Sequence, residues 1–178
     1  MSHQNKSGQP PEMIWFRCAS WVAGTNFPEQ AFPWGKLMYS CDGLAKVNVE
    51  DDTYLSTPEF AIWLPPQTSH YSLSLTDIDY VIIHFHEKLC PLLPSKVAAL
   101  RINGIAKEII KEFSKRSINY PSNQADDNLA TVLVEQLALS ESFNCFLPIS
   151  EDRVISKITQ KMLDNLKKFK HLNIGVIN

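Results

Sequence analysis

The sequence predicts an α+β protein in which an all-β first half is followed by a helical second half. The first observation is a series of about seven short apolar strands between residues 13 and 86, separated by turn residues at near-regular spacing, as in a small barrel or sandwich. The second is a change of pattern after Leu89, where period-two alternation gives way to apolar residues at helical spacing. Strands and helices are therefore segregated along the chain.

The composition is typical of a soluble globular protein. The 178 residues suit one core of ordinary size plus an appendage, and apolar and charged residues make up 44% and 20% of the chain. A net charge of −2 argues against non-specific nucleic-acid binding by the whole surface.

No apolar run approaches the roughly 20 residues of a spanning helix. Residues 1–12 read as a disordered lead without the apolar core of a signal peptide. We therefore expect a cytoplasmic protein that does not enter a membrane.

The cysteines point to the same compartment. Cys18, Cys41, Cys90 and Cys145 are widely separated, and no CxxC pair occurs. We expect buried free thiols in a reducing cytoplasm rather than a zinc knuckle.

Alternating apolar residues and turn residues define the predicted strands. Asp42 and Gly43 separate two alternating runs, which is a strong signal for a hairpin. The segment 27–35, with two prolines and Gly35, is expected to be a loop. The expected strands cover residues 13–18, 36–41, 44–50, 53–55, 60–64, 70–75 and 79–86.

The rest of the predicted β half is organised around the segment 58–70, PEFAIWLPPQTSH. Phe60, Ile62 and Leu64 share one face, as a half-buried strand requires. Two prolines at 65 and 66 end this strand, because neither donates to a β-ladder. His70 then opens the next strand, so it is expected at a stiff corner at the mouth of a hairpin.

Two helices are predicted after the strands, and residues 97–102 are a candidate for one more strand. Asn103 is a plausible N-cap for a helix over residues 104–115, with the apolar stripe Ile105, Ala106, Ile109, Ile110 and Phe113. A loop with Pro121 precedes a second helix over residues 126–140. One face of that helix carries Leu129, Val132, Leu133, Gln136 and Leu137.

A third unit begins near residue 147. Ser150 is a good N-cap for an amphipathic helix over residues 151–169, and residues 171–178 look like the start of another helix. Residues 148–178 carry a net charge of +3, which favours binding of this segment to phosphate groups.

Taken together, these stretches resemble the N-terminal part of AraC-family transcription regulators. The resemblance depends on KLMYSCDGLAKVNVED, FAIWLPPQTSH, the helical pair and LPISEDRVISKITQKML. The spacing of Pro65 and His70 also resembles the second motif of the cupin barrels, with Glu59 and Gln67 in place of its glycines.

The resemblance implies a cupin-like β-barrel (jelly roll) over residues 13–94 and a helical linker or dimerisation region over residues 95–146. Residues 147–178 would hold only the first helix and the start of the second helix of a helix-turn-helix DNA-binding domain. DNA binding is therefore expected of a full-length domain and not of this chain alone.

The same resemblance implies a small-molecule effector in the barrel and a homodimer. The effector would favour one arrangement of the helical linker, and so of the two DNA-binding domains. Strand position and polarity select Lys36, Met38, His70, Tyr71 and His84 as candidate effector-binding residues. The stripe Leu129, Val132, Leu133, Gln136 and Leu137 is the candidate dimer contact, with packing on the barrel as its alternative.

The alternative function is a metal-dependent cupin enzyme, such as an isomerase or dioxygenase. Many cupins hold a metal with two histidines and a glutamate from the first motif and a histidine from the second. The first-motif region, residues 27–49, contains no histidine, and Phe32 and Trp34 lie where ligands are expected. His70 alone lacks the three or four ligands that a divalent ion needs. A metal site would therefore require His70, His84 and His86 together. We expect no enzyme, no metal and no cofactor.

Overall fold

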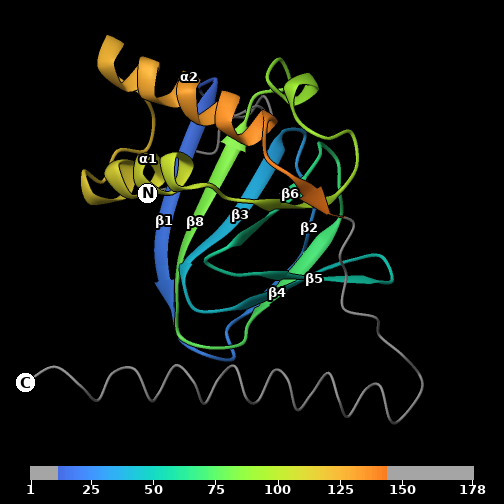
Figure 1. The fold of residues 1–178 in the computed structure, drawn as a ribbon. Coiled ribbons are helices and arrows are strands. Elements are labelled where there is room, and N and C mark those ends of the chain that lie inside the picture. Colours follow the sequence, from blue (N-terminus) through green and yellow to red (C-terminus); the bar gives the residue numbers. More distant parts are fainter. Residues whose placement is uncertain (1–11, 144–178) are drawn as a thin grey trace, which may run out of the picture.

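The computed structural model describes residues 12–143. Two facing β-sheets form the body of this segment, and two helices lie against one of them (Figure 1). The elements are β1 (Ile14–Trp21), β2 (Asn26–Gln30), β3 (Gly35–Asp42), β4 (Ala45–Val49), β5 (Asp52–Ser56), β6 (Phe60–Leu64), β7 (His70–Ser74), β8 (Ile78–Phe85), the 3-10 turn η1 (Cys90–Leu92), β9 (Ala98–Arg101), α1 (Gly104–Lys115), α2 (Gln124–Ala138) and β10 (Ser142–Phe143).

The strands form a cupin-like jelly roll, which confirms the predicted fold class. One sheet has the order β1-β8-β3-β6-β9-β10 and the other the order β2-β7-β4-β5, with antiparallel pairing throughout. The chain crosses between the sheets at most of its connections, and the two sheets enclose an interior. Strand β9 pairs with β6, so the larger sheet extends beyond residue 94 into the segment assigned to the helical linker.

Two predicted hairpins are wrong, because each of these turns joins one sheet to the other. Strand β3 pairs with β6 and β8, whereas β4 pairs with β5 and β7. The Asp42–Gly43 turn is therefore a corner. Gly43 adopts φ +85°, and a β-carbon at this position would lie 2.3 Å from the Asp77 carbonyl oxygen. The double-proline turn likewise leads from β6 in one sheet to β7 in the other. His70 stands at a corner, as expected, but not at a hairpin.

The loop predicted over residues 27–35 is also wrong in its first part. Residues 26–30 form β2, an edge strand that pairs with β7 with a register shift between Phe27 and Gln30. An edge strand with a bulge accommodates Pro28, which has no N–H to donate. Only residues 31–34 remain as a connection between β2 and β3.

Both faces of the larger sheet are buried. In β6, Ile62 and Leu64 face the interior between the sheets, while Ala61 and Trp63 join the apolar layer under the helices. The half-buried strand expected from the alternation of Phe60, Ile62 and Leu64 is thus covered on its second face as well. That face is covered because α1 and α2 lie across it (Figure 1).

Helix α1 has the predicted bounds and the predicted cap. The Asn103 side chain accepts a hydrogen bond from the Ala106 N–H, and Ala106, Ile109, Ile110 and Phe113 are buried. Ile105, predicted in the same stripe, is 56% exposed. Phe113 stacks on Phe16 of β1 with ring centroids 4.3 Å apart, which fixes the helix on the sheet.

Helix α2 begins two residues earlier than predicted, because Asn123 caps it and accepts from the Asp126 N–H. The buried Asp126 carboxylate accepts from Arg116 at the end of α1 and from the Asn123 amide, which joins the two helices. Leu133 and Leu137 are buried in the core of the chain itself. These two residues of the predicted dimer stripe are therefore already covered, which corresponds to the alternative of packing on the barrel.

The other stripe residues are more accessible. Val132 is 37% exposed, Leu129 is partly buried against the same core, and Gln136 accepts a hydrogen bond from Asn103.

Of the described cysteines, Cys18 is exposed and Cys41 and Cys90 are half-buried, and all three are free thiols. No described helix has the length and hydropathy needed to cross a membrane. The predictions for residues 1–11, for Cys145 and for the third unit at residues 147–178 lie outside the described residues.

Candidate functional site

Three of the five predicted effector-binding residues meet in the interior of the jelly roll. Lys36 of β3 lies opposite His84 of β8 in the sheet register, so the two side chains share the inner face. His70 enters from the first position of β7 in the other sheet. All three side chains are buried, and Lys36 is only 3% exposed. Lys36, His70 and His84 are called the basic cluster below.

Hydrogen bonds determine which atoms of the basic cluster donate. His70 Nδ1 lies 3.0 Å from the Thr68 carbonyl oxygen, which only accepts, so Nδ1 carries the ring hydrogen. His70 Nε2 is then an acceptor, and Lys36 Nζ donates to it at 2.9 Å. Trp34 Nε1 donates to His84 Nδ1 at 2.7 Å, so the neutral His84 ring carries its hydrogen on Nε2.

The segment 31–34 covers the basic cluster, and its aromatic residues are called the aromatic strap below. Lys36 Nζ lies 5.2 Å from the centre of the Phe32 ring, within the range of a cation–π interaction. The Phe32 ring centre is 6.3 Å from that of His70 and 6.0 Å from that of His84. Phe32 also stacks on Trp34 at 5.1 Å, and its carbonyl accepts from the Gln67 N–H at the double-proline corner.

Burial disfavours charge throughout the basic cluster. It lowers the pKa of Lys36 to about 7, with a further contribution from Arg17. It lowers the pKa of His70 to about 4 and that of His84 to about 3, and the positive charge of Lys36 acts in the same direction on both. None of the ion pairs among residues 12–143 involves Lys36. The basic cluster is therefore a buried group of donors without a negative partner in this part of the chain.

The remaining two predicted residues lie apart from the polar groups. Met38 follows Lys36 on the inner face of β3, where it packs with Ile62 and Leu64 of β6. Tyr71 is 49% exposed, whereas His70 and Ser72 on either side are buried, so its side chain points away from the interior. Met38 supplies an apolar wall next to the basic cluster, and Tyr71 does not line it.

The three histidines of the enzyme alternative are not assembled. His86 lies beyond the end of β8 and accepts a hydrogen bond from the Lys88 N–H at 3.3 Å. No group of three or more histidine, cysteine, aspartate or glutamate side chains in the described segment has the geometry to hold a metal ion.

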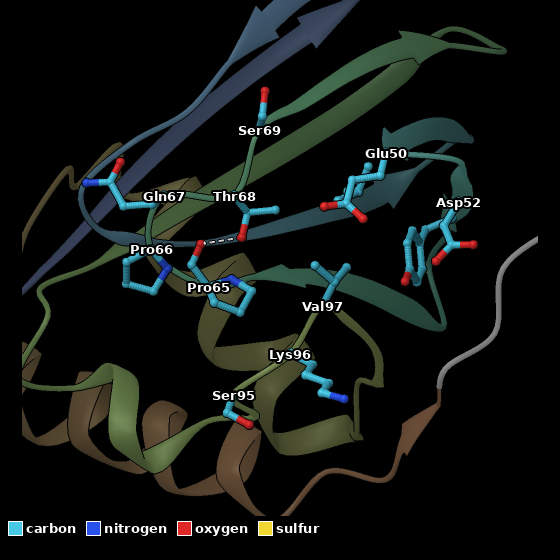
Figure 2. A pocket seen from close by; sticks show the side chains of 12 residues that line it. Glu50, Asp52, Pro65, Pro66, Gln67, Thr68, Ser69, Ser95, Lys96 and Val97 are labelled. Carbon is cyan, nitrogen blue, oxygen red and sulfur yellow. Dashed lines mark hydrogen bonds between the residues drawn. The ribbon is translucent and has the colours of Figure 1, made fainter.

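A surface cleft of about 710 Å³ adjoins the corner that carries His70 (Figure 2). Its walls are the β4–β5 turn with Glu50, the residues Pro65 to Ser69, and the segment Ser95 to Val97. Glu50 and Gln67 adopt φ values of 52° and 65°, and Thr68 Oγ1 donates to the Pro65 carbonyl at 2.7 Å. The cleft meets the site through Thr68, whose carbonyl accepts from the His70 ring, and through Gln67, whose N–H donates to the Phe32 carbonyl. Of its charged residues, Glu50 and Lys96 are exposed and Asp52 is half-buried, whereas the basic cluster is fully buried and is the stronger candidate site.

Sequence reasoning missed the aromatic strap as a part of the site. The sequence marks Phe32 and Trp34 only as occupants of the region where a cupin enzyme would have its metal ligands. The available signal was their spacing, i and i+2, between two strands and beside a lysine at position 36. That spacing directs both rings to one side of an extended segment.

Comparison with known proteins identifies a regulator as a relative. The chain is 21% identical over 128 residues to the HTH-type transcriptional regulator NimR of Escherichia coli (strain K12), covering 72% of this chain and 46% of that protein. The structure is similar to a variant of apo ToxT from Vibrio cholerae, with a TM-score of 0.56, 11% identity, and coverage of 70% of this chain and 54% of that one. A cupin superfamily protein from Desulfitobacterium hafniense aligns with a TM-score of 0.41 and 15% identity, covering 44% of this chain and 72% of that one.

No protein-family model matches the chain. The chain spans about half the length of NimR and of the ToxT chain. It is thus similar to a transcriptional regulator in sequence, and its jelly roll with appended helices is a fold that ToxT shares.

Proposed function

We propose that residues 12–143 form the effector-binding domain of a transcriptional regulator of the AraC type. The observation that carries the proposal is the basic cluster, a buried lysine and two histidines inside the jelly roll to which residues 12–143 supply no acidic partner. Three buried polar side chains this close together lower the stability of the fold unless a ligand or a hydrogen-bond network satisfies their donors and acceptors. The similarity to NimR over 72% of the chain supports a role in transcription. In this proposal the protein is cytoplasmic, binds no metal or cofactor, and performs no catalysis.

Strand β3 supports a route from the effector to the helices. Lys36 and Met38 face the interior, while Leu37 and Tyr39, one residue further along in each case, belong to the apolar layer under α1 and α2. A ligand that shifts β3 at the basic cluster therefore also shifts the surface on which Ile110 and Phe113 pack. The arrangement of the helices, and of DNA-binding domains that follow them in a homodimer, would respond to the effector.

A thermal-shift screen of small acids, sugars and aromatic compounds tests the proposal. A true effector raises the melting temperature of the wild type and of Tyr71→Ala, whose side chain points outward, because binding to the folded state stabilises it. The same compound gives a much smaller shift with His70→Ala. A compound that stabilises all three proteins equally binds elsewhere, and the site assignment is then wrong.

Mass spectrometry of each hit after prolonged incubation separates binding from catalysis. The proposal requires that the compound is recovered unchanged. Its conversion by the wild type but not by His70→Ala would identify an enzyme instead.

A further inference from the structure

The surface cleft beside the double-proline corner carries two carboxylates without a paired cation. Glu50 and Asp52 belong to the wall formed by the β4–β5 turn, opposite Pro65 and Pro66 (Figure 2). None of the ion pairs among residues 12–143 includes either carboxylate, or Lys96, which lines the same cleft. With two carboxylates and one ammonium group, the charged side chains of the cleft leave one negative charge in excess. The cleft therefore attracts a cation.

The hydroxyl group of Tyr54 is a third oxygen at this wall. Tyr54 is only 5% exposed, because its ring packs in the interior between the sheets. Its hydroxyl forms no hydrogen bond with any residue between 12 and 143. Among these residues, only the Tyr80 hydroxyl is both unpaired and completely enclosed. The Tyr54 hydroxyl must therefore open onto the cleft, which this residue lines.

The local structure holds these three groups together. Asp52 and Tyr54 are two residues apart on β5, so both side chains lie on the same face of the strand. Glu50 precedes this strand in the tight β4–β5 turn, where it adopts a left-handed conformation at φ 52°. Next to the turn, the buried Thr53 Oγ1 donates to Asn48 Oδ1 at 2.8 Å, which ties the two strands together. Burial raises the pKa of Tyr54, and the charges of Asp52 and Glu50 act in the same direction, so both carboxylates lie close to this hydroxyl.

The rest of the cleft suits a small apolar group. Val49 lies opposite Asp52 in the register of β4 and β5, and Pro65 and Val97 line the cleft from the other sheet. The volume of about 710 Å³ lies in the usual range of small-molecule sites. The basic cluster in the interior has the opposite charge. The cleft and the basic cluster therefore select different ligands, although Thr68 belongs to the surroundings of both.

We infer that this cleft is a second ligand site, which binds a primary amine with a small apolar body. A primary ammonium group has three N–H donors, and the wall offers the carboxylates of Glu50 and Asp52 and the hydroxyl oxygen of Tyr54 as three acceptors. The two hydrogen bonds to carboxylates are charge-assisted and therefore the stronger ones. The apolar body packs against Val49 and Val97. This inference goes beyond the proposed function and does not depend on it.

An NMR titration of the isotope-labelled chain of 178 residues at pH 7 tests the ligand class. Two pairs of compounds differ only in the charged group: benzylamine with benzyl alcohol, and pentylamine with pentanol. At least one amine should bind about tenfold or more tightly than its alcohol, as expected for charge-assisted hydrogen bonds. The N,N,N-trimethyl derivative of that amine keeps the charge but has no N–H to donate, and it should bind about threefold or more weakly than the amine. The amide signals that shift should belong to the β4–β5 turn and to residues 65–69 and 95–97.

Variants of the turn separate a built site from general electrostatic attraction. Asp52→Asn and Glu50→Gln should each weaken binding of the amine about fivefold or more, because each removes one charged acceptor. Asp51→Asn removes the same charge from an exposed residue of the same turn that does not line the cleft, and its affinity should stay within about twofold of the wild type. Tyr54→Phe should weaken binding of the amine about threefold through the loss of one hydrogen bond. Circular dichroism of each variant confirms that it is folded.

Several results would overturn the inference. Equal binding of amine and alcohol would exclude an ammonium site, and so would the absence of binding by any amine. An equal loss of affinity in Asp51→Asn and Asp52→Asn would show that the amine responds only to net charge. Shifted signals confined to the interior around Lys36, or binding of Mg²⁺ in place of the amine, would also overturn it. None of these outcomes bears on the proposed effector domain, whose test depends on His70.

Discussion

Replacement of Lys36 by methionine should stabilise the protein at neutral pH. The lysine is buried between the sheets, and the described residues give it no acidic partner, so the folded state disfavours its charged form. Its pKa falls from 10.5 to about 7, and the unfolded chain therefore binds more protons than the folded chain between these two values. The stability of the wild type must then rise with pH across this window. Below pH 7 both states are protonated and the full penalty remains.

The magnitude follows from the size of the shift. A change of roughly 3.5 pKa units corresponds to a penalty of about 5 kcal/mol at most. Methionine removes this penalty but also the bond from Lys36 Nζ to His70 and the contact with the Phe32 ring, together worth about 2 kcal/mol. Lys36→Met should therefore exceed the wild type by up to about 3 kcal/mol in free energy of unfolding at pH 7. This advantage should fall by up to about 1.4 kcal/mol per pH unit as the pH rises toward 10.

Urea denaturation followed by circular dichroism at pH 7, 8 and 9 measures this difference. The difference between variant and wild type isolates Lys36 from other groups, such as Cys41 and Tyr39, whose pKa values burial raises to about 11 and about 12. Lys46→Met serves as a control for the loss of a lysine on a half-exposed face. A difference that stays constant with pH would refute the reasoning, because Lys36 would then keep its charge in the folded state.

Three further predictions concern acid sensitivity, a corner and a helix face. His84→Gln should reduce the loss of stability between pH 6.5 and 4, because burial and the charge of Lys36 lower the pKa of this histidine to about 3. Denaturation midpoints of the variant that fall with pH in parallel with those of the wild type would contradict this. Gly43→Ala should lower the free energy of unfolding by several kcal/mol, since its new methyl group would lie 2.3 Å from the Asp77 carbonyl oxygen at a backbone φ of +85°. Gly24→Ala, at φ +82° with no atom within 4 Å of the new methyl group, should lower it by only about 1 kcal/mol. Equal melting temperatures of the two glycine variants would show that the corner is not tightly packed. Leu133→Ala should lower the free energy of unfolding, measured by urea denaturation, by about 2–5 kcal/mol. Val132→Ala should lower it by less than about 1 kcal/mol, because of these two residues only Leu133 is fully buried in the core. The reverse order would mean that α2 presents its other face to the sheet.

Local chemistry in the sequence determined the elements. Alternation of apolar residues was sufficient to locate β3, β6 and β8, and the cap at Asn103 fixed the start of α1. The basic residues of the site were also accessible from the sequence, because period-two alternation assigns Lys36 and Met38 to one face of a strand. These features depend on interactions within a few residues, which the order of amino acids specifies directly.

Only the tertiary structure decided which elements meet. The Asp42–Gly43 pair specifies a tight reversal, but partners distant in sequence determined that β3 pairs with β8 rather than β4. The same holds for Leu133, whose helical face is apolar whether it meets a second subunit or the chain's own sheet. It holds also for Phe32, which contacts Lys36, His70 and His84 because three separate strands converge around it. Strand pairing and burial are properties of the whole packed chain, since each strand and each apolar face has several possible partners and only their joint packing selects among them.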